Sequence, residues 1–286
     1  MSAAGGIKPV VAERAMSRPQ WVRANVAAVF ALLVRAPRAE AVFGWRTPLL
    51  RLVVGAIVAV VAILATMLVL DAWAIAQARR LPVWLVDAFN EITEFGRSGW
   101  FLVPAGLLLA AIALLTSPTL PPMTRLTCTV LSLRLGFLFL AIGLPGLVVT
   151  IAKRLIGRAR PLIDGNLDPL LFRFPNWSVE YASLPSGHAT NAFAVAVALG
   201  ALWPKGRPLF WSYAFVIAVS RVVVTAHHPS DVLAGAIAGV LGALFVRDWF
   251  AARRLGFLPD GQGGVRTLPG PSLARIKRVA RQLAGQ

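Results

Sequence analysis

Six stretches of the chain are apolar enough to be considered as membrane spans. A spanning helix needs about 20 apolar residues at a rise of about 1.5 Å each, and somewhat fewer where flanking side chains compensate. The first stretch meets this requirement without one charged residue, whereas the fourth is short. The predicted spans are 52–70, 100–116, 135–152, 189–203, 209–226 and 232–246. The pattern therefore predicts an all-α integral membrane protein built as a six-transmembrane-helix bundle.

The pattern divides the chain into three parts. Residues 1–46 form an N-terminal segment, 47–250 the membrane domain, and 251–286 a basic tail. The apolar segment 21–34 is too short to cross and is flanked by arginines, so we expect it to lie along the membrane interface. In the tail, apolar residues recur at helical spacing between basic residues: Leu273, Ile276, Val279 or Ala280, and Leu283. Two interpretations of this basic helix stay open, a solvated tail and a contact with anionic lipid.

The distribution of lysine and arginine predicts the orientation. The chain has 29 Lys and Arg against 12 Asp and Glu, a formal net charge of +17. Cytoplasmic loops are enriched in cations, and one side of the predicted bundle receives 20 of them while the other receives 9. Both termini should therefore be cytoplasmic. Residues 153–187 and 227–231 should then face the periplasm of a bacterial inner membrane.

Composition narrows the class of protein further. Hydrophobic residues make up 57% of the chain and charged residues only 14%, whereas soluble proteins carry roughly 25% charged residues. The single cysteine, Cys128, cannot form an intramolecular disulfide, and three histidines without a second cysteine argue against a structural zinc cluster. Disulfides and zinc are therefore not expected to hold this fold together.

A first cluster of chemically informative residues follows the third predicted span. Four cations, Lys153, Arg154, Arg158 and Arg160, lie within eight residues on the side that the charge rule keeps poor in cations. Snorkelling anchors would explain one or two of them. Arginine matches phosphate oxygens bidentately and lysine adds a compact charge. The set therefore favours an anionic ligand and predicts a phosphate clamp.

A second cluster, 184–191, opens the fourth predicted span. Ser186 can cap the helix, Gly187 lets the backbone approach a ligand, and the helix dipole attracts an anion there. A plain helix cap would account for the serine and glycine alone. His188 favours a functional interpretation, because a group that titrates near neutrality beside an anion site can donate a proton to a leaving group.

A third cluster joins the fifth and sixth predicted spans. It contains Ser220, Arg221, His227, His228 and Asp231. Asp231 lies four residues after His227, close enough for its carboxylate to hold one imidazole nitrogen and leave the other free to attack. A buried interfacial histidine with a capping aspartate would explain this segment if it stood alone. All three histidines of the chain fall within the second and third clusters, which favours phosphoryl transfer through a histidine.

Together the three clusters resemble the signature motifs of the type 2 phosphatidic acid phosphatase and haloperoxidase superfamily. The matching residues are Lys153 with Arg160-Pro161, Pro185-Ser186-Gly187-His188, and Ser220-Arg221 with His227 and Asp231. Order and internal spacing both agree, over about residues 100–250. Many members carry aromatic residues where this chain has Val223 and His228.

The resemblance implies a role for each matching residue. Lys153, Arg160, Ser186, Gly187 and Arg221 would bind the phosphoryl group. His227 would be the nucleophile that forms a phosphohistidine, with Asp231 as its orienting partner. His188 would protonate the leaving alcohol and then activate water. The spacing to the flanking motif residues favours His227 over His228 as the nucleophile. The resemblance implies no metal, and we expect no other cofactor.

The sequence thus predicts a metal-independent hydrolase acting on lipid phosphate esters or diphosphates, with a phosphorylated membrane lipid as partner and no nucleic acid. Phosphatidate, phosphatidylglycerol phosphate, undecaprenyl diphosphate and lipid A all fit the same clamp. An anion transporter or channel is the alternative, although transporters place their sites near the midplane, often between repeated halves. A serine protease using Ser186 would leave Lys153 and Arg160 unexplained. Six spans without a large soluble body disfavour the haloperoxidase branch.

Overall fold

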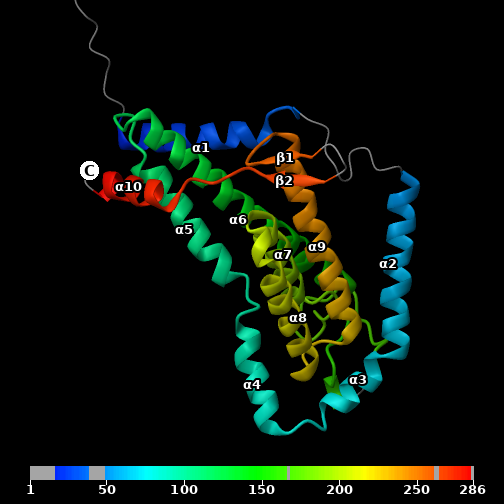
Figure 1. Cartoon of the computed structure of the whole chain (residues 1–286). Helices are drawn as coiled ribbons and strands as arrows, with labels where there is room; N and C mark the ends of the chain where they lie inside the picture. Colours follow the sequence, from blue (N-terminus) through cyan, green and yellow to red (C-terminus); the bar gives the residue numbers. More distant parts are fainter. Residues whose placement is uncertain (1–16, 39–48, 166–167, 261–263, 285–286) are drawn as a thin grey trace, which may run out of the picture.

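The computed structural model describes residues 17–38, 49–165, 168–260 and 264–284 (Figure 1). Their helices are α1 (Arg18–Val34), α2 (Leu49–Val69), α3 (Asp71–Ala78), α4 (Val83–Glu94), α5 (Gly99–Leu115), α6 (Pro122–Ile156), α7 (Gly187–Leu202), α8 (Arg207–Val223), α9 (Pro229–Ala252) and α10 (Leu273–Ala284), with short 3-10 turns at Ile163–Gly165 and Pro204–Gly206. The strands β1 (Phe257–Pro259) and β2 (Val265–Thr267) form an antiparallel hairpin. The fold is therefore all-α apart from this hairpin, as the sequence predicts.

Each of the six predicted spans overlaps a helix, although four of them run one to three residues past the end of that helix. The helices also differ in length. Within the described residues, four helical segments are long and apolar enough to cross a membrane: Leu49–Val69, Val83–Leu115, Pro122–Ile156 and Pro229–Ala252. The other two predicted spans correspond to α7 and α8, which have 16 and 17 residues. α9 continues to Ala252, two residues beyond the predicted end of the membrane domain.

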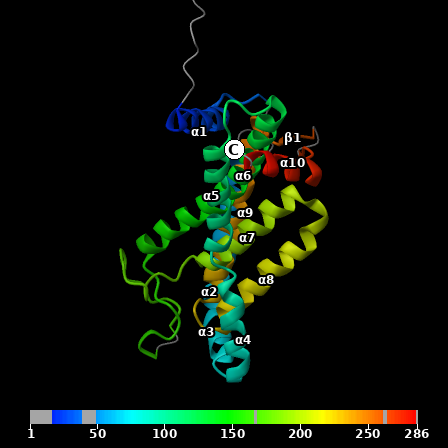
Figure 2. The ribbon, with the colours of Figure 1, turned by 90° about the vertical axis from the view of Figure 1, so that its left-hand side faces the viewer.

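The helix α7 lies at the centre of the bundle. It packs against α6, α8 and α9, and most of its side chains are small and fully buried. Small side chains let neighbouring backbones approach closely, and α9 presents glycines to α7. Figure 2 shows the segment between α6 and α7 on one side of the bundle and α8 on the other. α7 is therefore a core helix whose N-terminus is held by its neighbours.

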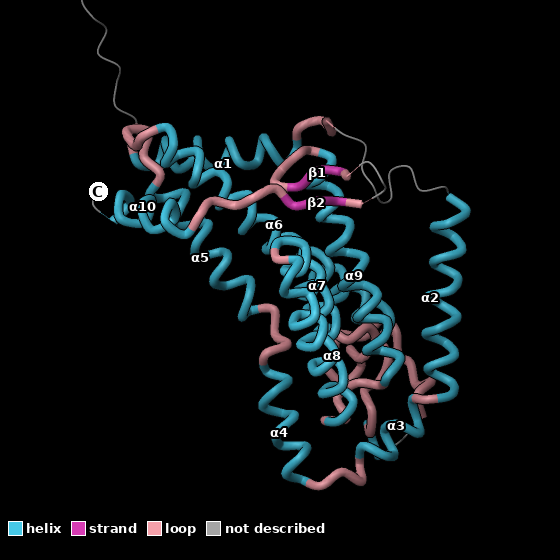
Figure 3. The backbone as a smooth tube through the Cα atoms, in the orientation of Figure 1, coloured by secondary structure: helices cyan, strands magenta, loops and turns pink. Residues whose placement is uncertain are grey.

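The two ends of the bundle differ in character. α1, α10 and the hairpin gather at one end, whereas α3, α4 and the long loop before α7 lie toward the other (Figure 3). At the first end, α1 crosses the bundle and its Asn25 donates hydrogen bonds to the carbonyl oxygens of Ala113 and Thr116 at the end of α5. α10 packs on α6, where the Thr124 hydroxyl donates to Gln282 at 2.6 Å. The predicted tail helix is thus confirmed, and its contact with lipid stays a prediction.

Candidate active site

The ends of four helices bring the predicted residues together. Lys153 lies in the last turn of α6, Arg221 in the last turn of α8, and His188 in the first turn of α7, while His227 immediately precedes the α9 N-cap. His188 lies close enough to Arg160, Arg221 and His227 for their charges to act on it. The three sequence clusters therefore form one site.

Local chain geometry explains how the first cluster enters this site. α6 ends at Gly157, which has a left-handed backbone (φ 61°). A Cβ atom there would lie 2.0 Å from the carbonyl oxygen of Arg173, so only glycine fits. The chain then turns away from the helix axis. Lys153 stays on the helix, while Arg158 and Arg160 come from the extended segment that follows.

The start of α7 forms the second part of the site. Ser186 is the N-cap residue, and its side chain accepts a hydrogen bond from the backbone nitrogen of Ala189 at 3.5 Å. Its own backbone nitrogen donates to the carbonyl oxygen of Asp231 at 2.9 Å, which ties α7 to α9. A Cβ atom on Gly187 would lie 4.0 Å from Lys153 Nζ. The lysine ammonium therefore stands beside a helix N-terminus, where both attract an anion.

Two arginines of the site carry a buried donor atom without a partner in the described structure. The Nε atoms of Arg160 and Arg221 are buried and have no hydrogen-bond partner within the described part of the chain. Arg221 is held by Thr93 of α4, whose hydroxyl accepts from Nη1 at 2.7 Å. A buried donor without an acceptor costs free energy, about 1–3 kcal/mol. Both groups are therefore suited to an anionic ligand that supplies oxygen acceptors.

His227 has the geometry of a neutral nucleophile. Its side chain is almost fully buried, and its Nδ1 lies 3.7 Å from Asp231 Oδ2 and 3.5 Å from the Ser183 hydroxyl. Burial lowers the pKa of His227 to about 4; Asp231 opposes this shift, while the Arg221 and Arg160 charges add to it. The described polar contacts of this imidazole thus use Nδ1, which leaves Nε2 to attack a substrate.

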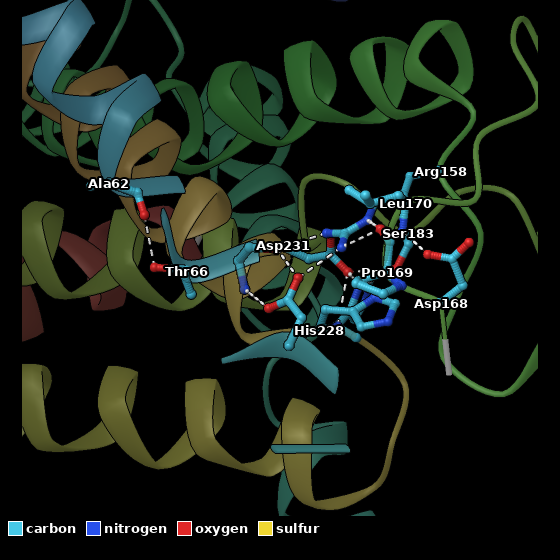
Figure 4. Close-up of polar contacts among 12 residues, drawn as sticks. Ala62, Thr66, Arg158, Asp168, Pro169, Leu170, Ser183, His228 and Asp231 are labelled. Carbon is cyan, nitrogen blue, oxygen red and sulfur yellow. Dashed lines mark hydrogen bonds and ion pairs between the residues drawn. The ribbon is translucent and has the colours of Figure 1, made fainter. Parts of the chain in front are cut away.

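Asp231 is the centre of a buried polar network (Figure 4). Its Oδ2 accepts from the Ser183 hydroxyl at 2.6 Å and from the backbone nitrogen of His228 at 2.9 Å. Its Oδ1 accepts from Arg158 Nη1 at 2.5 Å. His228 Nδ1 also lies 3.5 Å from this carboxylate and has no hydrogen-bond partner in the described structure. Both imidazoles therefore approach the same acid.

The network corrects the interpretation of the first cluster as four phosphate-binding cations. Arg158 is fully buried and forms ion pairs with Asp231 and with Asp71. Arg154 donates from Nη1 to the carbonyl oxygens of Trp177 and Ser178. Each has protein acceptors of its own, so Lys153 and Arg160 are left from this cluster as candidate phosphate ligands.

Three contributors were not predicted from the sequence: Asp71, Thr93 and Ser183. Each reaches the site from a segment outside the motifs or just before one. Asp71 carried a usable signal, because a charge placed directly at the end of an uncharged membrane span is costly and needs a partner. Among the described residues, His, Cys, Asp and Glu side chains form no group of three that could hold a metal ion.

Comparisons with known proteins identify the family of this chain. A model of the PAP2 superfamily matches residues 134–255, which contain all three clusters. A lipid A 1-phosphatase from Rhizobium johnstonii is 34% identical over 210 residues, which cover 70% of this chain and 82% of that protein. The bacitracin transport permease protein BcrC from Bacillus licheniformis is 28% identical over 178 residues, 60% of this chain and 83% of that one. The crystal structure of Aquifex aeolicus LpxE aligns with a TM-score of 0.44 and 22% identity, over 62% of this chain and 94% of that chain.

Proposed function

The chain belongs to the PAP2 superfamily of membrane lipid phosphatases, and we propose that it removes a phosphate group from a membrane lipid through a phosphohistidine on His227. One observation carries the proposal: the buried imidazole of His227, whose lowered pKa keeps it neutral, uses only Nδ1 in its described contacts and lies beside arginines whose buried Nε donors have no partner among the described residues. This arrangement supplies a nucleophile and the charge that a phosphoryl group requires.

The proposed reaction has two steps. In the first, His227 Nε2 attacks phosphorus, the bond from phosphorus to the lipid oxygen breaks, and His188 donates a proton to that oxygen. In the second, a water molecule gives a proton to His188 and attacks phosphorus, which releases inorganic phosphate and restores His227. Lys153, Arg160 and Arg221, with the Ser186 hydroxyl and the backbone amide of Gly187, stabilise the charge on the phosphoryl oxygens.

The lipid we propose is lipid A. The support is the similarity to a protein described as a lipid A 1-phosphatase, of which this chain covers 82%. The test is phosphate release by purified protein from lipid A, phosphatidate, phosphatidylglycerol phosphate and undecaprenyl diphosphate, without added metal. Release from lipid A at a rate well above the other three is expected. A preference for any other lipid in this panel contradicts the assignment of the substrate.

The assignment of the nucleophile is tested by replacing each of the two adjacent histidines by alanine in separate variants. His227→Ala should abolish phosphate release and leave no acid-labile phosphoprotein, because the covalent route has lost its nucleophile. His228→Ala should retain turnover. Both variants must elute as monodisperse protein in detergent. A dead His228 variant beside an active His227 variant would reverse the assignment.

We also propose six spans, cytoplasmic termini and a periplasmic active site in a bacterial inner membrane. Two features support this orientation. α1 and α10 lie together at one end of the bundle, away from the site (Figure 1), and the predicted loops and termini on that side carry 20 of the 29 lysines and arginines. Cysteines placed at Ser178 and Ser272, in a Cys128→Ser background, should label oppositely with an impermeant thiol reagent. In cells with a permeabilised outer membrane, we expect the reagent to label position 178 and to miss position 272. Labelling of position 272 alone would show the opposite topology.

Anion transport is the second candidate, because one relative is described as a transport permease. A transporter would move phosphate across a vesicle membrane without cleaving an ester bond. Proteoliposomes that contain the protein should release phosphate from lipid and show no faster flux of labelled phosphate than empty vesicles. Flux that persists in His227→Ala would favour the transporter.

A further inference from the structure

Asp71 is a buried carboxylate that reaches the active site from outside the three motifs. It is the first residue of α3, directly after the long apolar helix α2, and its side chain is fully buried. Its Oδ1 accepts from the backbone nitrogen of Ser230 at 2.9 Å, and its Oδ2 accepts from the Ser230 hydroxyl and from Arg158. The end of α2 and α3 is thus bonded to the first turn of α9.

Arg158 joins Asp71 to the partner of the nucleophile. Its Nη2 lies 2.7 Å from Asp71 Oδ2, and its Nη1 lies 2.5 Å from Asp231 Oδ1. Pro169 supplies a carbonyl oxygen to Nε at 3.0 Å and to Nη2 at 2.8 Å, and the Ser230 hydroxyl accepts from Nη1 at 2.7 Å. Each nitrogen of the guanidinium therefore donates to a protein acceptor, so the group is fixed in place.

The charges of this triad do not cancel. Two carboxylates and one guanidinium leave a net charge of −1, whereas Arg158 and Asp231 alone would be neutral. All three side chains are fully buried, where charges are screened far less than in water. His227 Nδ1 lies 3.7 Å from this triad. When Nε2 bonds to phosphorus the imidazole becomes cationic, and a negative neighbour stabilises it.

We propose that Asp71 is a positioning residue for the reaction: it offsets the charge of Arg158, so that Asp231 keeps its negative charge available to His227. This inference rests on the proposed phosphohistidine route. Asp71 does not touch the substrate, and it acts through Arg158 and Asp231. The triad also explains why the first cluster contains Arg158, an arginine that is fully buried and has no access to phosphate.

The first test is Asp71→Asn, which removes the charge and keeps the size of the side chain. We expect kcat for lipid phosphate to fall about 10- to 100-fold while KM changes little, because the phosphate ligands are untouched. Vanadate, which bonds to the nucleophile, should inhibit about 10-fold more weakly, while inhibition by inorganic phosphate stays the same. Glu91→Gln, an exposed acid on α4, is the matched control and should behave as wild type.

A purely structural role would give a different pattern. It would weaken inhibition by phosphate and by vanadate together and raise KM, and that result overturns the proposal. An Asp71→Asn variant with wild-type kcat overturns it too, while leaving the proposed function intact. A wild-type protein that releases no phosphate from any lipid refutes the proposed function instead.

The double variant Asp71→Asn/Arg158→Gln gives an independent test, and it applies even where the single variant does not fold. Removing both charges leaves Asp231 alone with a charge of −1, as in the intact triad. Replacement of a buried ion pair by neutral groups is often tolerated. We expect the double variant to keep kcat within about 10-fold of wild type and above that of Asp71→Asn. A folded double variant whose kcat lies more than about 100-fold below wild type overturns the inference.

Discussion

Gly235 fixes the distance between α9 and the start of α7, and its replacement by alanine tests whether the site depends on that distance. A Cβ atom on Gly235 would lie 2.4 Å from the carbonyl oxygen of Ser186 and 3.2 Å from Ala189 Cβ. Ordinary carbon–oxygen contacts are longer than about 3.2 Å, so the two backbones must separate by about 1 Å. The displaced residues are the N-cap of α7 and, two residues later, His188.

Two effects of this displacement have predictable sizes. Overpacking of a close-packed contact costs about 1–3 kcal/mol of stability. A shift of about 1 Å in a reacting group lowers the rate about 100-fold. We therefore expect Gly235→Ala to lower kcat by about two orders of magnitude and to lower the midpoint of thermal unfolding by a few degrees.

The assay measures phosphate release from lipid in detergent micelles together with thermal unfolding of the same preparation. Gly55→Ala in α2 is the matched control, because nothing lies within 4 Å of its Cβ position, and it should leave both quantities unchanged. Gly235→Ala with wild-type kcat would refute the reasoning. Equal loss in both variants would also refute it, since the effect would then not arise from contact with Ser186.

Three further predictions concern the chemistry of the site. His188→Ala should reduce kcat/KM far more for an alkyl phosphate than for p-nitrophenyl phosphate, whose leaving group hardly needs a proton; equal losses would make His188 a phosphate ligand only. Activity should survive excess EDTA, because Lys153, Arg160 and Arg221 meet the phosphoryl charge; loss that magnesium restores would contradict this. The pKa of His227 is lowered to about 4, so its imidazole should remain neutral as the pH falls from about 8 to about 5 in nitrogen NMR spectra of labelled histidine. A titration near the ordinary value of 6.5 would show that the side chain is hydrated.

Most of the long helices could be predicted from the sequence, because the length of an apolar stretch is counted along the chain and needs no knowledge of tertiary contacts. Each of the six apolar stretches overlaps a helix, yet α7 and α8 are shorter than the four segments that are long enough to cross a membrane. α7 is enclosed by other helices, so its many small residues are explained by close packing against those helices. α4 was not predicted, because Asp87, Glu91 and Glu94 interrupt its apolar pattern, although it adjoins α5 in one long segment.

Contacts within the active site could be predicted only between residues that are close in the sequence, because their separation along the chain fixes their distance in space. His227 lies just before the N-cap of α9 and Asp231 in its first turn, so their proximity follows from four residues of separation. The partner of Arg158 does not follow in this way, because charge alone cannot distinguish a phosphate ligand from an arginine held between two acids. Asp71 lies 87 residues from Arg158. Only the tertiary fold, which places the start of α3 beside the segment that follows α6, brings them together.

The order of the triad along the chain has a consequence for biosynthesis. Asp71 is synthesised first, Arg158 follows 87 residues later, and Asp231 comes 73 residues after Arg158. A nascent chain that has reached α7 contains both Asp71 and Arg158, and we expect these two charges to pair before the last helix is made, because an unpaired charge at the membrane is costly. Synthesis of α9 then adds Asp231 to the neutral pair of Asp71 and Arg158, together with His227, which lies just before the N-cap of α9. The nucleophile and its negative partner are thus delivered together in the last membrane segment, and we expect a nascent chain that stops before α9 to have no phosphatase activity.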